Sequence, residues 1–205
     1  MPYKLSEEKY KAIKSKFKDC ARLIKTKELT ELGIRSEDIV RFLEQGRLEK
    51  ITHGCYRLVS NTDISDESLI ASLYPDGVLC MYTALFYYGY SDRTPLAWDI
   101  AIDRNASKAR FNLDYPFVRP YYMAKQLLCF GVSDARYPDC TMRIFDRDRL
   151  ICEALRYENK LDRETLNKAI QGYIADSKRN ISNLIEYARR RNMLNKVKER
   201  IEVWL

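Results

Sequence analysis

The chain has 205 residues, 46% of them hydrophobic, and a formal net charge of +7. This apolar content is enough for a packed core and excludes an intrinsically disordered chain. No segment reaches the roughly 18 to 20 consecutive apolar residues that span a bilayer. The first residues lack the apolar stretch of a secretory signal, so we expect a cytoplasmic protein with no membrane partner.

The positive charge lies toward the two ends of the chain. Residues 1–60 hold 14 Lys and Arg against 9 Asp and Glu, residues 61–145 hold 8 against 10, and residues 146–205 hold 14 against 10. Basic surfaces attract polyanions by releasing bound counterions, so nucleic acid is the first class of partner to consider. The alternative that composition alone leaves open is a cytosolic protein that is merely basic.

The cysteines and the single histidine, His53, do not have the spacing of a metal site. A zinc site needs four ligands at characteristic intervals, and no Cys-x-x-Cys pair is present. The sequence also lacks the glycine-rich loops that cradle phosphates in nucleotide-binding enzymes. We therefore expect no metal and no other cofactor.

The N-terminal part of the chain has the apolar spacing of helices. Apolar residues at helical spacing, Tyr10, Ile13 and Phe17, predict a first helix starting at Ser6. Thr26 is a suitable N-cap for a short second helix, and Gly33 fits the left-handed position at its end.

A third helix is expected over residues 37–45, capped by Ser36, with Ile39, Val40 and Leu43 buried and Arg41 exposed. Two short helices joined by a tight turn form a helix-turn-helix, whose second helix enters the DNA major groove.

A β-hairpin follows this helix pair directly. Residues 46–51 and 55–59 are predicted as strands, and residues 52–54 as the turn between them, which makes the unit a winged helix-turn-helix. The candidate DNA-binding residues are basic and hydroxyl residues of this region together with its histidine: Lys25, Lys27, Arg35, Ser36, Arg41, Arg47, Lys50, Thr52, His53 and Arg57. Because some winged helices bind proteins instead, a protein-interaction scaffold is the alternative.

A short polar segment, residues 61–66, predicts a hinge between an N-terminal domain of residues 1–62 and a second domain of residues 63–205. The second domain is expected to be α+β, with a small mixed sheet followed by C-terminal helices. Its predicted helices cover 67–73, 78–88 and the region from Asp148 onward, with N-caps at Asp162 and Asn180. Its predicted strands cover 98–102, 117–122, 127–132 and 141–145.

A second basic patch is expected near the C-terminus, formed by Arg189, Arg190, Arg191, Lys196 and Lys198. Such a cluster can contact DNA beside the winged helix or another acidic partner. It equally fits a solvated basic helix end that complements the helix dipole.

One pattern in the chain is typical of an enzyme. Pro138-Asp139 followed by Glu158-Asn159-Lys160 resembles the Pro-Asp…Glu-x-Lys signature of magnesium-dependent nucleases. That chemistry places the Glu-x-Lys segment on a strand, whereas here it falls between two predicted helices, so we expect no enzyme.

Taken together, several segments resemble the AbiEi family, the antitoxins of type IV toxin–antitoxin and phage abortive-infection systems. The segments are Thr26-Lys27-Glu28-Leu29, Gly33-Ile34, Gly46-Arg47-Leu48-Glu49, Gly54-Cys55-Tyr56-Arg57, and residues 82–92, 95, 98–102, 146–153 and 180–188. The resemblance implies an antitoxin that represses its own operon by binding inverted repeats in double-stranded promoter DNA. It also implies a nucleotidyltransferase-like toxin as functional partner, neutralised without a stable complex. Since no coiled-coil seam is present, the expected form is a monomer that binds the repeats cooperatively.

Overall fold

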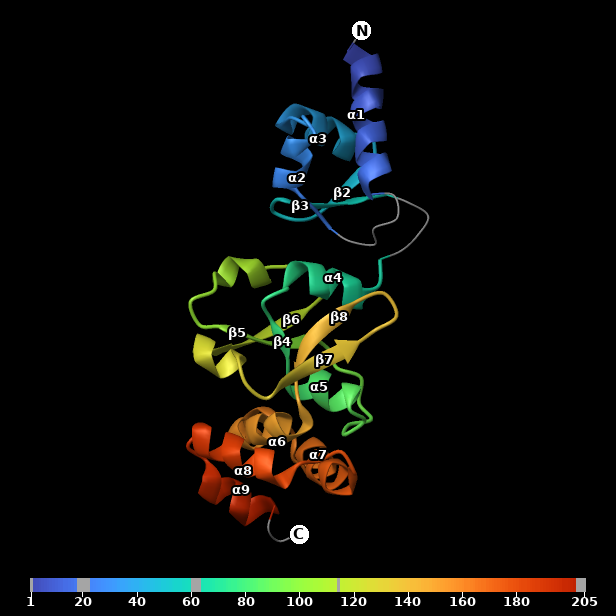
Figure 1. The fold of residues 1–205 in the computed structure, drawn as a ribbon. Coiled ribbons are helices and arrows are strands. Elements are labelled where there is room, and N and C mark those ends of the chain that lie inside the picture. Colours follow the sequence, from blue (N-terminus) through green and yellow to red (C-terminus); the bar gives the residue numbers. More distant parts are fainter. Residues whose placement is uncertain (1, 18–22, 60–63, 114, 202–205) are drawn as a thin grey trace. The chain divides into compact units, whose positions relative to one another are not determined.

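The computed structural model describes residues 2–17, 23–59, 64–113 and 115–201 (Figure 1). The chain divides into two compact units, Met1–Tyr74 and Pro75–Leu205. This division lies later in the chain than the expected boundary between residues 62 and 63, part of a segment that falls outside the described residues. The predicted α+β class is confirmed, and no helix among the described residues is long and apolar enough to cross a membrane.

The first unit is a winged helix-turn-helix, as predicted. Its elements are α1 (Pro2–Phe17), β1 (Ile24–Lys25), α2 (Thr26–Glu31), α3 (Ser36–Glu44), β2 (Leu48–Thr52) and β3 (Cys55–Leu58), followed by α4 (Asp66–Leu73). The three strands form an antiparallel sheet in the order β1-β3-β2. Strand β1, which was not expected, adds the third strand to the hairpin.

The main core of this unit joins α1, α2 and α3 to the sheet. Ile13 and Phe17 of α1, Leu29 of α2, and Ile39 and Phe42 of α3 are buried together, with further members Ile24, Ile34 and Leu48. The prediction that Val40 is buried is wrong, because its exposed fraction is 52%. A helix turns about 100° per residue, so Ile39 and Phe42 share the inner face while Val40 points away from it.

The helix starts differ from those predicted. Helix α1 begins at Pro2 rather than Ser6, and proline suits the first helical position. Thr26 and Ser36 are the first residues of α2 and α3, so the N-caps are Lys25 and Arg35. In each case an acidic side chain three residues on accepts the cap N–H: Glu28 Oε2 from Lys25 at 2.9 Å and Asp38 Oδ2 from Arg35 at 3.1 Å. The carboxylate half of a capping box thus replaces the predicted hydroxyl cap.

The second unit has a five-stranded mixed sheet in the order β6-β5-β4-β8-β7. The strands are β4 (Val78–Leu79), β5 (Trp98–Asp103), β6 (Val118–Met123), β7 (Val132–Arg136) and β8 (Thr141–Phe145). The pairs β4–β8 and β5–β6 are parallel, and the pairs β4–β5 and β7–β8 are antiparallel.

Helices complete this unit. They are α5 (Met81–Tyr87), α6 (Arg147–Arg156), α7 (Arg163–Ala175), α8 (Ile181–Arg190) and α9 (Leu194–Ile201), with short 3-10 helices η1 (Lys108–Phe111), η2 (Lys125–Leu128) and η3 (Glu158–Lys160). Helices α6 to α9 gather on one side of the sheet, and α6 contacts α5, α7, α8 and α9 (Figure 1). The predicted N-caps are confirmed: Asp162 accepts the N–H of Thr165 at 2.9 Å, and Asn180 that of Asn183 at 3.1 Å.

Two predicted elements of this unit are wrong. The single buried helix expected over residues 78–88 is split into β4 and α5, because Val78 and Leu79 pair with strands on both sides. The strand expected over residues 127–132 is the end of η2 followed by a turn, and the strand β7 starts only at Val132. Short apolar runs fit a buried strand and a buried helix equally well, and only the hydrogen-bond partners distinguish them.

Candidate nucleic-acid interface

The turn of the wing is fixed to the start of helix α2. Gly54 O accepts hydrogen bonds from Thr26 N at 2.9 Å and from Thr26 Oγ1 at 3.2 Å. Gly54 has a φ of +74°, a conformation that disfavours residues with a Cβ atom. The wing turn and the first residues of α2 therefore form one rigid corner, which places His53 and Lys25 on the same part of the unit.

The outer face of the wing sheet carries charge. Lys25 lies opposite Cys55, and Glu49 lies opposite Arg57. Because directly opposite residues share a face and side chains alternate along a strand, all four lie on one face. Arg57 Nε donates to Glu49 Oε2 at 2.6 Å, so part of this face is already neutralised.

Most of the predicted DNA-binding residues are exposed to solvent. Lys25, Lys27, Arg35, Ser36, Arg41, Lys50 and His53 are exposed, whereas Arg47, Thr52 and Arg57 are half-buried. None of the five exposed Lys and Arg side chains forms an ion pair with a carboxylate among the described residues. A basic side chain without an internal partner keeps its full attraction for phosphate.

Arg47 differs from these residues because it holds the unit together. It hydrogen-bonds Glu7 of α1, and its guanidinium carbon lies 4.7 Å from the centroid of the Tyr10 ring. The hydrogen bond from Arg47 lowers the pKa of Glu7 below its ordinary value. Arg47 therefore joins α1 to the start of the hairpin, a structural task that the sequence pattern did not reveal.

Helix α3 is oriented by a second such contact. Lys9 Nζ of α1 donates to Asp38 Oδ2 at 2.5 Å, which lowers the pKa of Asp38. With Asp38, Ile39 and Phe42 turned inward, the exposed face carries Ser36, Glu37, Val40, Arg41 and Glu44.

These exposed side chains can read base edges. Arginine pairs with guanine, a carboxylate accepts from the amino group of cytosine, and an apolar side chain contacts the thymine methyl group. Sequence reasoning included Ser36 and Arg41 in the site but missed Val40, Glu37 and Glu44, and the helical periodicity of the buried residues was the signal that could have found them.

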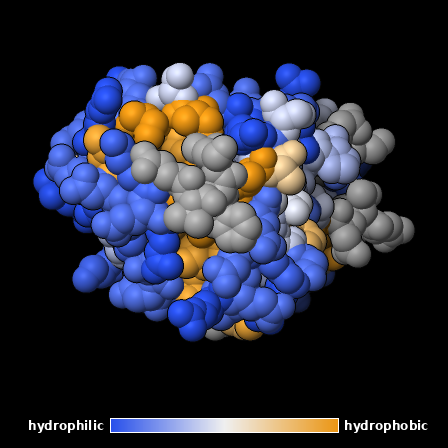
Figure 2. Space-filling view, turned by 90° about the horizontal axis from the view of Figure 1, so that it is seen from below, coloured by the Kyte–Doolittle hydropathy of each residue, from blue (hydrophilic) through white to orange (hydrophobic). Residues whose placement is uncertain are grey.

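The expected C-terminal basic patch is not one surface. Arg191 is buried against Glu153, with its Nε 2.7 Å from Glu153 Oε1. Arg190 pairs with Glu186 at 2.5 Å and Lys196 with Glu158 at 2.9 Å, while Arg189 and Lys198 are exposed. The inclusion of Arg191 in a partner-binding patch was wrong, because a side chain in the interior cannot reach a partner. Viewed from the end where α7, α8 and α9 lie, the surface is mostly hydrophilic with a limited apolar part (Figure 2).

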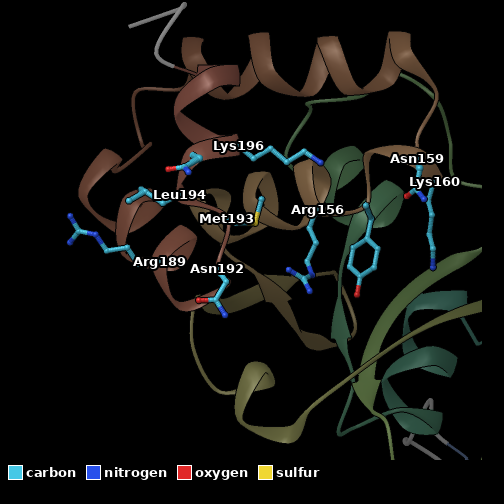
Figure 3. A pocket seen from close by; sticks show the side chains of 10 residues that line it. Arg156, Asn159, Lys160, Arg189, Asn192, Met193, Leu194 and Lys196 are labelled. Carbon is cyan, nitrogen blue, oxygen red and sulfur yellow. The ribbon is translucent and has the colours of Figure 1, made fainter.

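The same region is hollowed by a pocket of about 970 Å³. The residues that line it are Arg156, Tyr157, Asn159, Lys160, Arg189, Asn192, Met193, Leu194, Asn195 and Lys196. Figure 3 shows the side chains of Arg156, Lys160 and Asn192 extending in the same direction from three different segments. The lining contains four basic residues and no Asp or Glu. Lys196 pairs with Glu158, which leaves Arg156, Lys160 and Arg189 for an anionic ligand.

The nuclease-like pattern is placed on unsuitable elements. Glu158 and Lys160 belong to η3 rather than to a strand, and Asp139 lies in the turn between β7 and β8. Glu158 is engaged by Lys196 at 2.9 Å and by Arg200 at 3.4 Å. Within the described ranges there is no group of three His, Cys, Asp or Glu that could hold a metal ion.

Comparison with known proteins supports the fold. No family model and no curated protein matches the sequence. The crystal structure of the RV2827C protein from Mycobacterium tuberculosis is similar, with a TM-score of 0.66 and 14% sequence identity, over 94% of this chain and 79% of that chain. At this identity the likeness shows a shared fold.

Proposed function

We propose that the first unit binds double-stranded DNA, with α3 in the major groove and the wing on the phosphate backbone. The observation that carries this proposal is the winged helix-turn-helix itself, whose third helix has a buried apolar side and an exposed side holding Ser36, Val40 and Arg41. Around it, the exposed Lys25, Lys27, Arg35, Lys50 and His53 can contact phosphates or the minor groove. Arg47, Thr52 and Arg57 are half-buried and border this surface.

The biological role we propose is that of an antitoxin and autorepressor. The resemblance to the AbiEi family supports this role, in which the chain binds inverted repeats in its own promoter and counters a nucleotidyltransferase-like toxin without a stable complex. In this role the chain itself is not an enzyme and works in the cytoplasm. The second unit would carry the antitoxin activity.

DNA binding is tested with the purified full chain and a labelled duplex from directly upstream of its coding region. Fluorescence anisotropy should show binding that is tighter than to a scrambled duplex of equal length. The affinity should fall by orders of magnitude between about 50 and 200 mM salt, because phosphate contacts release counterions. No binding at low salt would contradict the proposal and favour a protein-interaction scaffold. Equal affinity for both duplexes would contradict base reading by α3 in the major groove.

The antitoxin role needs a separate experiment. A nucleotidyltransferase-like protein encoded beside this chain should arrest growth when expressed alone, and co-expression of the full chain should restore growth. The two proteins should not co-elute in size-exclusion chromatography. Continued growth arrest in the presence of the chain would contradict the antitoxin role and leave the DNA-binding proposal intact.

A further inference from the structure

Asp99, on strand β5, is a buried carboxylate with one oxygen left unused. Its exposed fraction is 0%. Oδ2 accepts the N–H of Tyr82 at 2.9 Å, but Oδ1 has no hydrogen-bond partner among the described residues. Arg119 Nη1 lies 3.6 Å from Oδ1, too far for a hydrogen bond. Buried polar atoms are almost always satisfied, so an unused carboxylate oxygen calls for a donor from outside the chain.

Burial also raises the pKa of Asp99 to about 6, although Arg119 opposes this effect. The carboxylate is thus incompletely stabilised by its own surroundings, which agrees with the missing donor.

Asp99 lines a small pocket of about 260 Å³. The other lining residues are Tyr82, Arg93, Thr94, Pro95, Leu96, Ala97, Arg119, Lys160 and Asp162. Some of these groups are already engaged with one another: Tyr82 Oη donates to Asp162 Oδ2 at 3.2 Å, and Arg93 pairs with Glu164 at 2.6 Å. The polar groups that remain for hydrogen bonds to a ligand are Lys160 and the pair of Asp99 Oδ1 and Arg119, whose 3.6 Å ion pair leaves Oδ1 without a hydrogen bond.

Lys160 connects this small pocket to the larger basic pocket, because it lines both. Its ammonium group lies 4.9 Å from the centroid of the Tyr121 ring and 5.1 Å from that of Tyr157. No carboxylate pairs with it in the described part of the chain. The two pockets together therefore present a carboxylate at one end and a row of cations, continued by Arg156, at the other.

This arrangement specifies the chemistry of a ligand. A carboxylate accepts hydrogen bonds from hydroxyl groups and repels phosphate, whereas lysine and arginine bind phosphate. Acidic side chains hold ribose hydroxyls in nucleotide-binding folds by the same hydrogen bonds.

We propose that the second unit binds a ribonucleotide, with its ribose hydroxyls on Asp99 and its phosphate on Lys160 and Arg119, toward the basic pocket. The ribonucleotide can be free or can be the end of a single RNA strand, whose further phosphates then follow Arg156 into the basic pocket. This site is independent of the winged helix and does not rest on the proposed DNA-binding function.

The test uses the full chain and three probes: AMP, 2′-deoxy-AMP and a labelled four-nucleotide RNA. Calorimetry and anisotropy should show binding of AMP, of the RNA or of both, and which of them binds identifies the source. Removing the 2′ hydroxyl should weaken binding about tenfold, since a charged hydrogen bond is lost. Equal binding of AMP and its deoxy analogue, or no binding of either AMP or RNA, would overturn the proposal.

Two variants and a matched control locate the site. Asp99→Asn keeps an acceptor for Tyr82 but loses the second carboxylate oxygen, and Lys160→Gln removes the phosphate-binding charge; each should weaken binding about tenfold. Lys178→Gln removes an exposed lysine outside both pockets and should leave binding unchanged. Because Lys160 is not part of the core, its variant tests the site even if Asp99→Asn disturbs folding. Unchanged binding in Lys160→Gln would reject the site.

Discussion

Arg191 donates two hydrogen bonds to Glu153, from Nε to Oε1 at 2.7 Å and from Nη2 to Oε2 at 2.9 Å. Arg149 Nε donates to the same Oε1 at 2.7 Å, so one carboxylate lies between two guanidinium groups. The three side chains are at most 5% exposed. Arg149 also lies over the Phe130 ring, 4.0 Å from its centroid. This triad fixes the end of α8 to α6.

Replacing Glu153 by Ala should lower the free energy of unfolding by about 3 to 5 kcal/mol. Without the carboxylate, two buried cations remain next to each other with no counter-charge. Urea titration followed by circular dichroism measures this loss. The control is Glu186→Ala, which removes an exposed partner of Arg190 and should cost less than about 1 kcal/mol. Similar losses in the two variants would contradict the structural role of the triad.

Replacing Gly131, a glycine beside the triad, should also lower the stability of the fold. Gly131 has a φ of +60°, and a Cβ atom there would lie 2.7 Å from Arg149 Cβ and 3.1 Å from Tyr187 Cε2. Gly131→Ala should therefore cost about 2 to 4 kcal/mol, from backbone strain and from steric overlap.

The matched comparison is Gly89→Ala. Gly89 has a φ of +73° but nothing within 4 Å of the added Cβ, so only the strain of about 1 kcal/mol is expected. Thermal denaturation of both variants separates the two contributions. If both lose the same stability, the close approach of Gly131 to Arg149 has no energetic effect.

The raised pKa of Asp99 predicts a pH-dependent stability. The pKa rises from 3.8 to about 6 in the folded chain, so the folded state binds a proton more tightly than the unfolded state. The contribution of the Asp99 proton to the free energy of unfolding is fully present below about pH 3.8 and is lost as the pH rises through 6. Relative to Asp99→Asn, the natural chain should therefore lose roughly 2 to 3 kcal/mol between those two pH ranges.

Urea titrations of the natural chain and of Asp99→Asn at pH 4.5 and 7.5 measure this difference. The contributions of all other titrating groups are the same in the two proteins and cancel in the comparison. A stability difference between the two proteins that stays constant with pH would show that Asp99 has an ordinary pKa.

The DNA-binding proposal predicts different effects for two residues of the first unit. Lys50→Ala removes a phosphate contact and should weaken binding to all duplexes alike, with a salt dependence reduced by about one counterion. Arg41→Ala on α3 should cost about 1 to 3 kcal/mol for the promoter duplex and less for a scrambled one, because a base contact is lost.

Anisotropy titrations at several salt concentrations measure both effects. Arg104→Ala removes an exposed arginine of the second unit and serves as the charge-matched control. If Arg41→Ala and Lys50→Ala bind like this control, the winged helix is not the DNA-binding surface.

Local sequence patterns determined much of the first unit. The positions of α2, α3 and the hairpin follow from apolar spacing and from Gly33, Gly46 and Gly54, which all have positive φ values. Such patterns act over a few residues, so they can be read directly from the chain.

Only the tertiary structure decided which charges are available to a partner. Glu153 and Arg191 are 38 residues apart, and Glu7 and Arg47 are 40 apart, yet each pair is in contact. A count of basic residues cannot distinguish such paired side chains from free ones such as Arg41, because pairing depends on distances that packing sets. The same holds for Asp99, Arg119 and Lys160, which come from β5, β6 and η3 and line one pocket only because the sheet and η3 bring them together.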